Sequence, residues 1–164
     1  FFIGGPYIAV KVFNLSPTVM GIYLSFPALG YVLGNILVSR IANLVSTKNL
    51  MVFGSLILVL GPCSSLLLSN FFLHPLSFYL PILIMTFGSG IIWPASNAEI
   101  VKAIPHLAGS ASGLGSAIMT LMSSFAAFLT GIYIEESNPM DFVCYFLILV
   151  GLLSFFSSLC SRSK

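Results

Sequence analysis

Long uncharged stretches, separated by short segments that carry the charges, dominate the chain. They lie between neighbouring charged residues, over 12–39, 49–98, 103–134 and 142–161. A helix of roughly 20 apolar residues crosses the hydrocarbon core of a bilayer. Three of these stretches hold one such helix each, and 49–98 holds two because its apolar pattern breaks at 69–77. The pattern therefore predicts complete transmembrane helices near 18–38, 50–68, 78–98, 110–133 and 142–161.

Residues 1–10 are also apolar but are too few to cross a membrane. As a helix they rise only about 15 Å, half of the hydrocarbon core. A helix that ends in lipid leaves unpaired backbone groups, which are costly there. We therefore expect 1–10 to be part of a truncated helix, and the chain to be the tail of a longer protein.

The composition excludes several classes of protein. The chain is 58% hydrophobic and 6% charged, whereas soluble domains carry about 25% charged residues. We expect an all-α membrane protein, a bundle of five full transmembrane helices and a truncated first one. A net charge of +2 argues against nucleic acid as a partner. Cys63, Cys144 and Cys160 share no repeated spacing, which argues against disulfides or a metal site, and no cofactor is expected.

The charged residues also predict an orientation. Five helices place alternate loops on opposite sides of the membrane. One side receives the basic residues Arg40, Lys48, Lys102, Arg162 and Lys164, opposed only by Glu99. The other side receives Lys11 with the acidic residues Glu135, Glu136 and Asp141. Because basic loops stay in the cytoplasm, we expect a cytoplasmic C-terminus.

Residues 108–115, AGSASGLG, are unusually rich in glycine and serine. A phosphate-binding loop would need a preceding strand and a following Lys-Ser or Lys-Thr pair, which are missing. A serine hydrolase would need a base within reach of Ser112, but the histidines, His74 and His106, do not lie on a later helix. We therefore expect no enzyme activity.

Helical spacing explains this segment better. Small residues recur every three or four positions, at Gly109, Gly113, Ser116, Thr120, Ser124, Ala127 and Gly131. Bulky residues form a second stripe, beginning at Leu114 and Ile118. Helices in lipid associate through small faces that let backbones approach closely. We therefore expect Gly109, Gly113 and Ser116 to pack on a neighbouring helix, and Gly30 and Gly34 to form a second packing pair.

Prolines and one acidic residue mark further positions of interest. Pro27 lies in the middle of its helix, and Pro94 follows Gly88 and Gly90. Each site is either ordinary helix irregularity or a bending point for a gate. Glu99 is either a solvated helix end beside Lys102 or an ion-coupling site, and the first interpretation is preferred.

Several motifs in order resemble a known family. They are GPYIAVKVFNLSPTVMG at 5–21, FPALG at 26–30 with Gly34, PASN at 94–97 and AGSAS at 108–112. Together they resemble helices seven to eleven of major facilitator drug-efflux transporters, above all the bicyclomycin/chloramphenicol-resistance (Bcr/CflA) subfamily. The resemblance covers almost the whole chain.

The resemblance implies a twelve-helix exporter in the inner membrane of a bacterium, of which this chain is the C-terminal half. Such proteins export small hydrophobic molecules in exchange for protons. The expected partners are therefore membrane lipid, the missing N-terminal six-helix half, a small hydrophobic substrate and the proton. In relatives the proton-coupling acid usually lies in the other half. The alternative is a non-transporting membrane fragment from a split or decayed transporter gene.

The resemblance also suggests, loosely, which residues line the substrate cavity. Helices seven, eight, ten and eleven line it in such transporters. The candidates for substrate binding in this chain are Tyr7, Phe26, Phe87, Trp93, Asn97 and Met119. For Trp93 the alternative is the aromatic belt at the membrane surface, and for Asn97 it is a helix-end hydrogen bond. For the others it is packing between helices.

Overall fold

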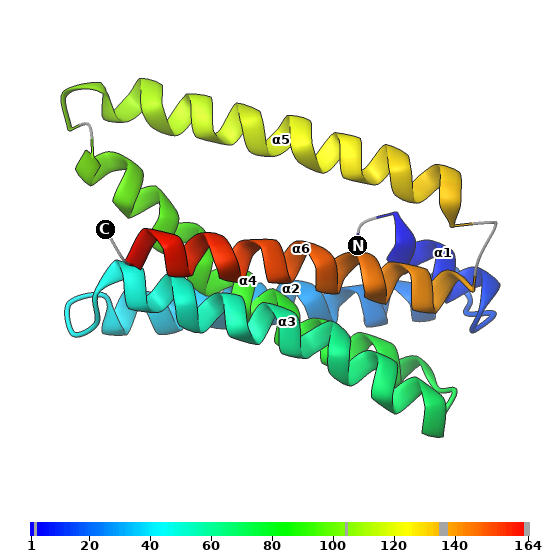
Figure 1. Ribbon diagram of the computed structural model, residues 1–164. Helices are drawn as coiled ribbons and strands as arrows, with labels where there is room; N and C mark the ends of the chain where they lie inside the picture. The colour runs from blue at the N-terminus through cyan, green and yellow to red at the C-terminus, as the bar shows by residue number, and fades with distance from the viewer. Residues whose placement is uncertain (2, 104, 135–137, 163–164) are drawn as a thin grey trace.

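The computed structural model describes the chain except residues 2, 104, 135–137 and 163–164. The described residues form helices and no strands (Figure 1). The elements are α1 (Gly4–Lys11), α2 (Pro17–Ile41), α3 (Thr47–Phe71), α4 (Pro75–Ala103), the short 3₁₀ helix η1 (Pro105–Leu107), α5 (Ala108–Tyr133) and α6 (Pro139–Arg162). The predicted all-α fold is confirmed.

The five long helices are each long and apolar enough to cross a membrane. Each contains one predicted span and runs past its predicted ends, except that α5 ends at Tyr133 as predicted. The largest excess is in α4, which begins at Pro75 and continues to Ala103. Segment 1–10 corresponds to α1, which has 8 residues.

Proline and serine residues determine where the long helices begin. Pro17, Pro75 and Pro139 are the first residues of α2, α4 and α6. Proline suits this position because its missing N–H is one that a helix start leaves unpaired. Ser46 caps α3, where its hydroxyl accepts a hydrogen bond from the Asn49 amide at 3.4 Å. These local signals mark the starts of α2, α3, α4 and α6.

Helix α4 is the centre of the bundle, in contact with α2 on one flank and α3 on another, while α6 packs on α3. Phe78, Tyr79 and Ile82 of α4 are fully buried in a core that also includes Ile8 of α1. A second, smaller core lies around Ile91 of the same helix. Both cores thus depend on α4, which connects them along its length.

Helix α5 stands apart from the bundle (Figure 1). Of the residues in this helix, Thr130 is buried. A Cβ added to Gly109 or Gly113 would meet no atom within 4 Å, and Ser116 is exposed. In the described part of the chain, Gly109 and Gly113 thus meet no neighbouring helix, and the packing of this small face stays a prediction. Spacing identifies a small face but does not reveal whether a matching surface exists in the same chain.

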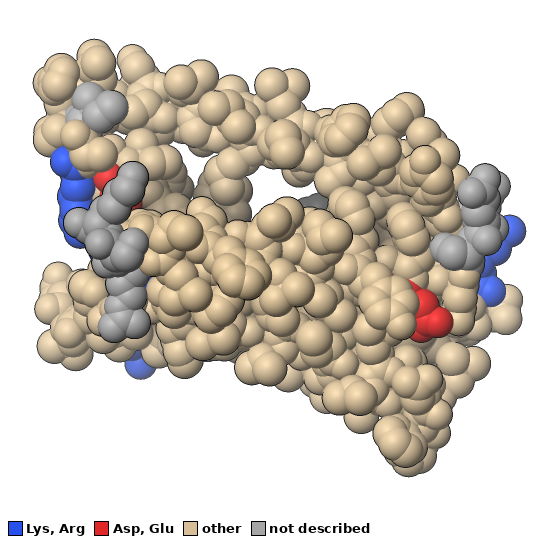
Figure 2. Space-filling view, viewed as in Figure 1, with Lys and Arg blue, Asp and Glu red and all other residues tan. Residues whose placement is uncertain are grey.

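The charged side chains lie at the two ends of the molecule. Figure 2 shows them at opposite ends of the visible face, with an uncharged band between them. One end contains Arg40, Lys48, Glu99 and Lys102, and the other contains Lys11 and Asp141. Such a band is what a membrane-spanning bundle requires, because a charge in the hydrocarbon core is costly.

Candidate functional site

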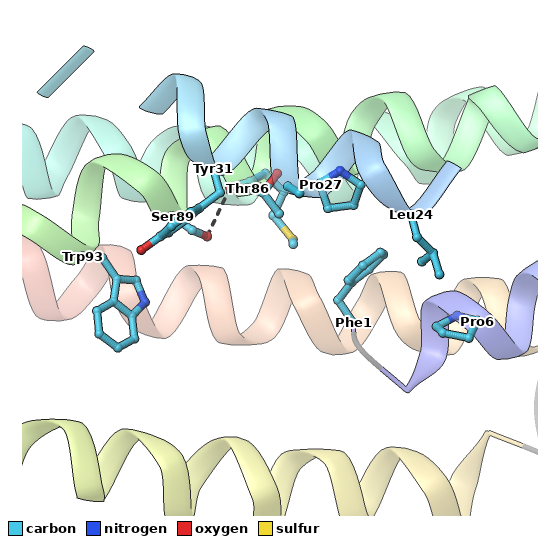
Figure 3. Close-up of a pocket in the computed structure, with 10 residues that line it drawn as sticks. Phe1, Pro6, Leu24, Pro27, Tyr31, Thr86, Ser89 and Trp93 are labelled. Atoms are coloured by element: carbon cyan, nitrogen blue, oxygen red, sulfur yellow. Dashed lines mark hydrogen bonds between the residues drawn. The ribbon is translucent and has the colours of Figure 1, made fainter. Parts of the chain in front are cut away.

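A cavity of about 700 Å³ lies between α1, α2 and α4 (Figure 3). Phe1 and Pro6 line it from the first residues of the chain. The remaining lining residues come from the middle turns of α2 and α4, and none of the lining side chains is charged. The side of the cavity away from α2 and α4 faces α5 (Figure 3). Figure 2 shows open space between α5 and the body of the molecule.

One face of α2 supplies part of the lining. Its residues are Leu24, Pro27, Ala28 and Tyr31. Their spacing of three or four places them on one side of the helix. Pro27 has no N–H, so it donates no hydrogen bond within α2, yet the helix continues through it.

One face of α4 supplies the rest of the lining. Met85, Ser89 and Trp93 follow one another every four residues, and Thr86 lies beside them. The hydroxyl of Thr86 donates to the carbonyl oxygens of its own helix, at 3.0 and 3.1 Å. Ser89 Oγ donates to the Met85 carbonyl oxygen at 3.3 Å. Both hydroxyl protons are thus held by the helix, and their oxygens remain available as acceptors.

Glycines set the distance between α2 and α4. A Cβ on Gly30 would overlap the carbonyl oxygen of Leu83. A Cβ on Gly34 would overlap the carbonyl oxygen of Phe87 and would lie 3.0 Å from the Cα of Gly90. The two helices therefore approach each other through their backbones at Gly30 and Gly34. This contact places Tyr31, which is adjacent to it on α2, next to Ser89 and Trp93.

The structure brings Trp93 to the cavity and leaves the other five predicted site residues out of its lining. Tyr7 is half-buried against the larger core. Phe26 stacks on Tyr23 with 6.1 Å between ring centres, and Phe87 packs against the smaller core. Their packing contacts, and their absence from the cavity lining, favour the packing roles that we considered as alternatives.

Asn97 and Met119 also lie outside the cavity lining. Asn97 is half-buried on α4, one turn beyond Trp93. Met119 is 43% exposed on α5. A binding role for the predicted residues stays a prediction.

Sequence reasoning missed Tyr31, Ser89 and most other lining residues. A helical wheel contains a usable signal, because residues 24, 27, 28 and 31 form one sector beside the packed Gly30 and Gly34. Phe26 lies on the opposite side of that glycine stripe. Selecting aromatic residues by type therefore chose a face of α2 that does not line this cavity.

A polar cluster joins the ends of α3 and α4 away from the cavity. The Thr47 hydroxyl donates a hydrogen bond to Glu99 Oε1. Lys102 Nζ lies 3.2 Å from Thr47 Oγ1 and 3.4 Å from Glu99 Oε1. Glu99 is therefore paired at a helix end, which favours the structural interpretation over an ion-coupling site.

Ser112 remains without the surroundings that a nucleophile needs. It is half-buried in the second turn of α5, whereas His74 is exposed just before α4. The Nδ1 atom of His74 accepts a hydrogen bond from the Leu76 amide at 3.2 Å. Among the described residues, Ser112 forms no hydrogen bond with a histidine or a carboxylate, so the geometry does not support a hydrolase.

Comparison with known proteins gives a consistent result. The profile of the Major Facilitator Superfamily matches residues 1–162. The chain is 24% identical over 155 residues to YdgK of Bacillus subtilis (strain 168), described as an uncharacterised MFS-type transporter. This alignment covers 93% of the chain and 38% of the relative, so the chain spans less than half of that protein. No solved structure matches the chain.

Proposed function

Because the chain belongs to the major facilitator superfamily, a family of membrane transporters, we propose that it is the C-terminal six-helix half of a twelve-helix exporter of small hydrophobic molecules. Because the motifs at 5–34, 94–97 and 108–112 resemble those of the Bcr/CflA subfamily, we assign the proposed exporter to it. The match to part of a longer transporter, covering 38% of it, supports the assignment to one half.

The observation that carries this proposal is the uncharged cavity between α1, α2 and α4. Its volume of about 700 Å³ lies within the usual range for sites that take drug-sized ligands. Ligand pockets of this kind are mostly apolar with a few placed polar groups. A charged ligand would lose its hydration without gaining a counter-ion from the lining, which is unfavourable.

Proton exchange is the proposed source of energy. Carboxylates inside membrane spans usually mark proton pathways. Glu99 is paired at a helix end, and none of the lining residues of the cavity is acidic. We therefore assign the coupling carboxylate to the other six-helix half, which is also the proposed partner of this chain.

The open face of α5 supports such a partner. A Cβ added to Gly109 or Gly113 meets no atom within 4 Å in the described part of the chain, and Ser116 is exposed. Small faces let helix backbones approach closely in lipid. We propose that membrane lipid surrounds the outer helices, and that the N-terminal half covers the cavity and the small face of α5.

An export assay tests this function. Cells that make the proposed twelve-helix protein should accumulate less of the uncharged dye Nile red than cells without it, and a protonophore should abolish the difference. Ala28→Trp fills the cavity from α2 and should remove export, whereas Ala42→Trp, at the exposed end of that helix, should retain it. Export by Ala28→Trp at the normal rate would contradict the proposal, and no export at all would favour the non-transporting fragment.

A labelling experiment tests the proposed orientation in a bacterial inner membrane. Asn43 and Asn138 are exposed at opposite ends of the bundle. With a cytoplasmic C-terminus, an impermeant maleimide added outside the inner membrane should label Asn138→Cys but not Asn43→Cys. Both variants should be labelled after the membrane is permeabilised, and the reverse order in intact cells would overturn the orientation.

A further inference from the structure

The two ends of the cavity differ in chemistry. Phe1, Leu24 and Pro27 form an apolar end, and Tyr31, Ser89 and Trp93 gather at the other end (Figure 3). In Figure 3 the ring of Tyr31 runs beside Ser89 toward the indole of Trp93. The ends are separated along α2 by the seven positions from Leu24 to Tyr31, about 10 Å along a helix.

The polar end offers two unused hydrogen-bond donors. The Ser89 hydroxyl already donates to the Met85 carbonyl oxygen at 3.3 Å. By contrast, neither the phenol of Tyr31 nor the indole N–H of Trp93 forms a hydrogen bond with another described residue. Both residues line the cavity, so we expect that a ligand acceptor can bind these donors without breaking an existing bond.

An unused donor in an apolar site discriminates strongly between ligands. A ligand that supplies an acceptor gains a hydrogen bond, whereas a ligand of the same shape without one leaves the donor unpaired. None of the lining side chains is charged, which makes an ionised ligand unfavourable. The two donors and the uncharged lining therefore define the chemistry of the ligand more narrowly than the hydrophobicity of the cavity alone does.

We propose that the cavity selects uncharged molecules in which an apolar group carries a hydrogen-bond acceptor oxygen, such as a ketone or amide carbonyl. The apolar part occupies the end formed by Leu24 and Pro27, and the oxygen binds the Tyr31 hydroxyl and the Trp93 N–H. Tyr31 is thereby a specificity-determining residue. This inference rests on the proposed export function and names the substrate class of the same cavity.

The chain contains its own probe for this test, because Trp93 is the one tryptophan in the sequence and lines the cavity. The purified chain in detergent is titrated with four ligands that share two phenyl rings, and Trp93 fluorescence is recorded. The ligands are 1,3-diphenylacetone, 1,3-diphenylpropane, the cation of 1,3-diphenylpropan-2-amine and the anion of dibenzylacetic acid. The ketone should bind about fivefold more tightly than the hydrocarbon and at least tenfold more tightly than either ion.

The variant Tyr31→Phe removes one hydroxyl and retains the fluorophore. It should weaken ketone binding about fivefold and leave hydrocarbon binding within twofold. Tyr23→Phe is the matched control, because Tyr23 lies on the same helix but stacks on Tyr79 with 5.3 Å between ring centres and does not line the cavity. When the affinities of two variants for the same ligand are compared, partition of that ligand into the detergent micelle affects both equally. It therefore cancels from their ratio.

The outcomes separate this inference from the function on which it rests. Equal affinity for the ketone and the hydrocarbon, or equal weakening of both by Tyr31→Phe, would overturn the selection of acceptors while leaving export of hydrophobic molecules intact. Tight binding of either ion would overturn the selection of uncharged ligands. If none of the four ligands changed Trp93 fluorescence, the cavity would not be a binding site, and the proposed function would fail with it.

Discussion

Helices α2 and α5 both carry small residues at helical spacing, yet their environments in the structure differ. On α2, Gly30 and Gly34 touch the backbone of α4. On α5, a Cβ added to Gly109 or Gly113 would have open space around it, with no atom within 4 Å. The difference lies in the facing helix, because α4 supplies Gly90 opposite Gly34. Close approach in lipid therefore requires small residues or bare carbonyls on both sides of the contact.

The largest expected effect is that of Gly34→Leu. The new side chain would overlap the backbone of α4, which cannot move without displacing α3 on its other flank. Overpacking of this kind costs on the order of 3 kcal/mol. Thermal unfolding of the purified chain in detergent, followed by circular dichroism, should show a marked loss of stability or no folded protein.

Gly21→Leu provides the matched control for Gly34→Leu. It lies on the same helix, but a Cβ added there meets no atom within 4 Å. Its stability should stay within about 0.5 kcal/mol of the parent chain. If both substitutions destabilised the chain equally, the cause would be the leucine in α2 and not its contact with α4.

Tyr79→Phe should have an intermediate effect, because it removes a polar contact and leaves the packing in place. The Tyr79 hydroxyl donates to the Gly5 carbonyl oxygen at 2.8 Å and connects α4 with α1. Buried hydrogen bonds in membrane bundles contribute about 1 kcal/mol. The same unfolding assay should detect a loss of that size, while Tyr145→Phe, at an exposed site on α6, should cause none. A loss above about 3 kcal/mol, well beyond one such bond, would mean that the hydroxyl, and not ring packing, holds α1.

The sequence predicts the long helices well because hydrophobic length and helix-start residues are local features. Pro17, Pro75 and Pro139 mark three starts without any knowledge of the fold. The cavity is harder to predict because it depends on which face of α2 meets α4. Gly30 and Gly34 identify that face once contact is known, and Tyr31 then follows as their neighbour. The environment of α5 could not be predicted, because its spacing does not name a partner.

The smallest expected effect in the isolated chain is that of Gly113→Leu. Since a Cβ at this position meets no atom within 4 Å, the unfolding free energy should change by less than about 0.5 kcal/mol. The same substitution in the proposed twelve-helix protein should cost more than about 1 kcal/mol, because a partner helix would face this residue. Leu114→Ile, at a 64% exposed neighbour, should be mild in both settings. A large loss in the isolated chain would mean that α5 packs on its own bundle, whereas equal tolerance in the larger protein would mean that the small face of α5 has no helical partner there either.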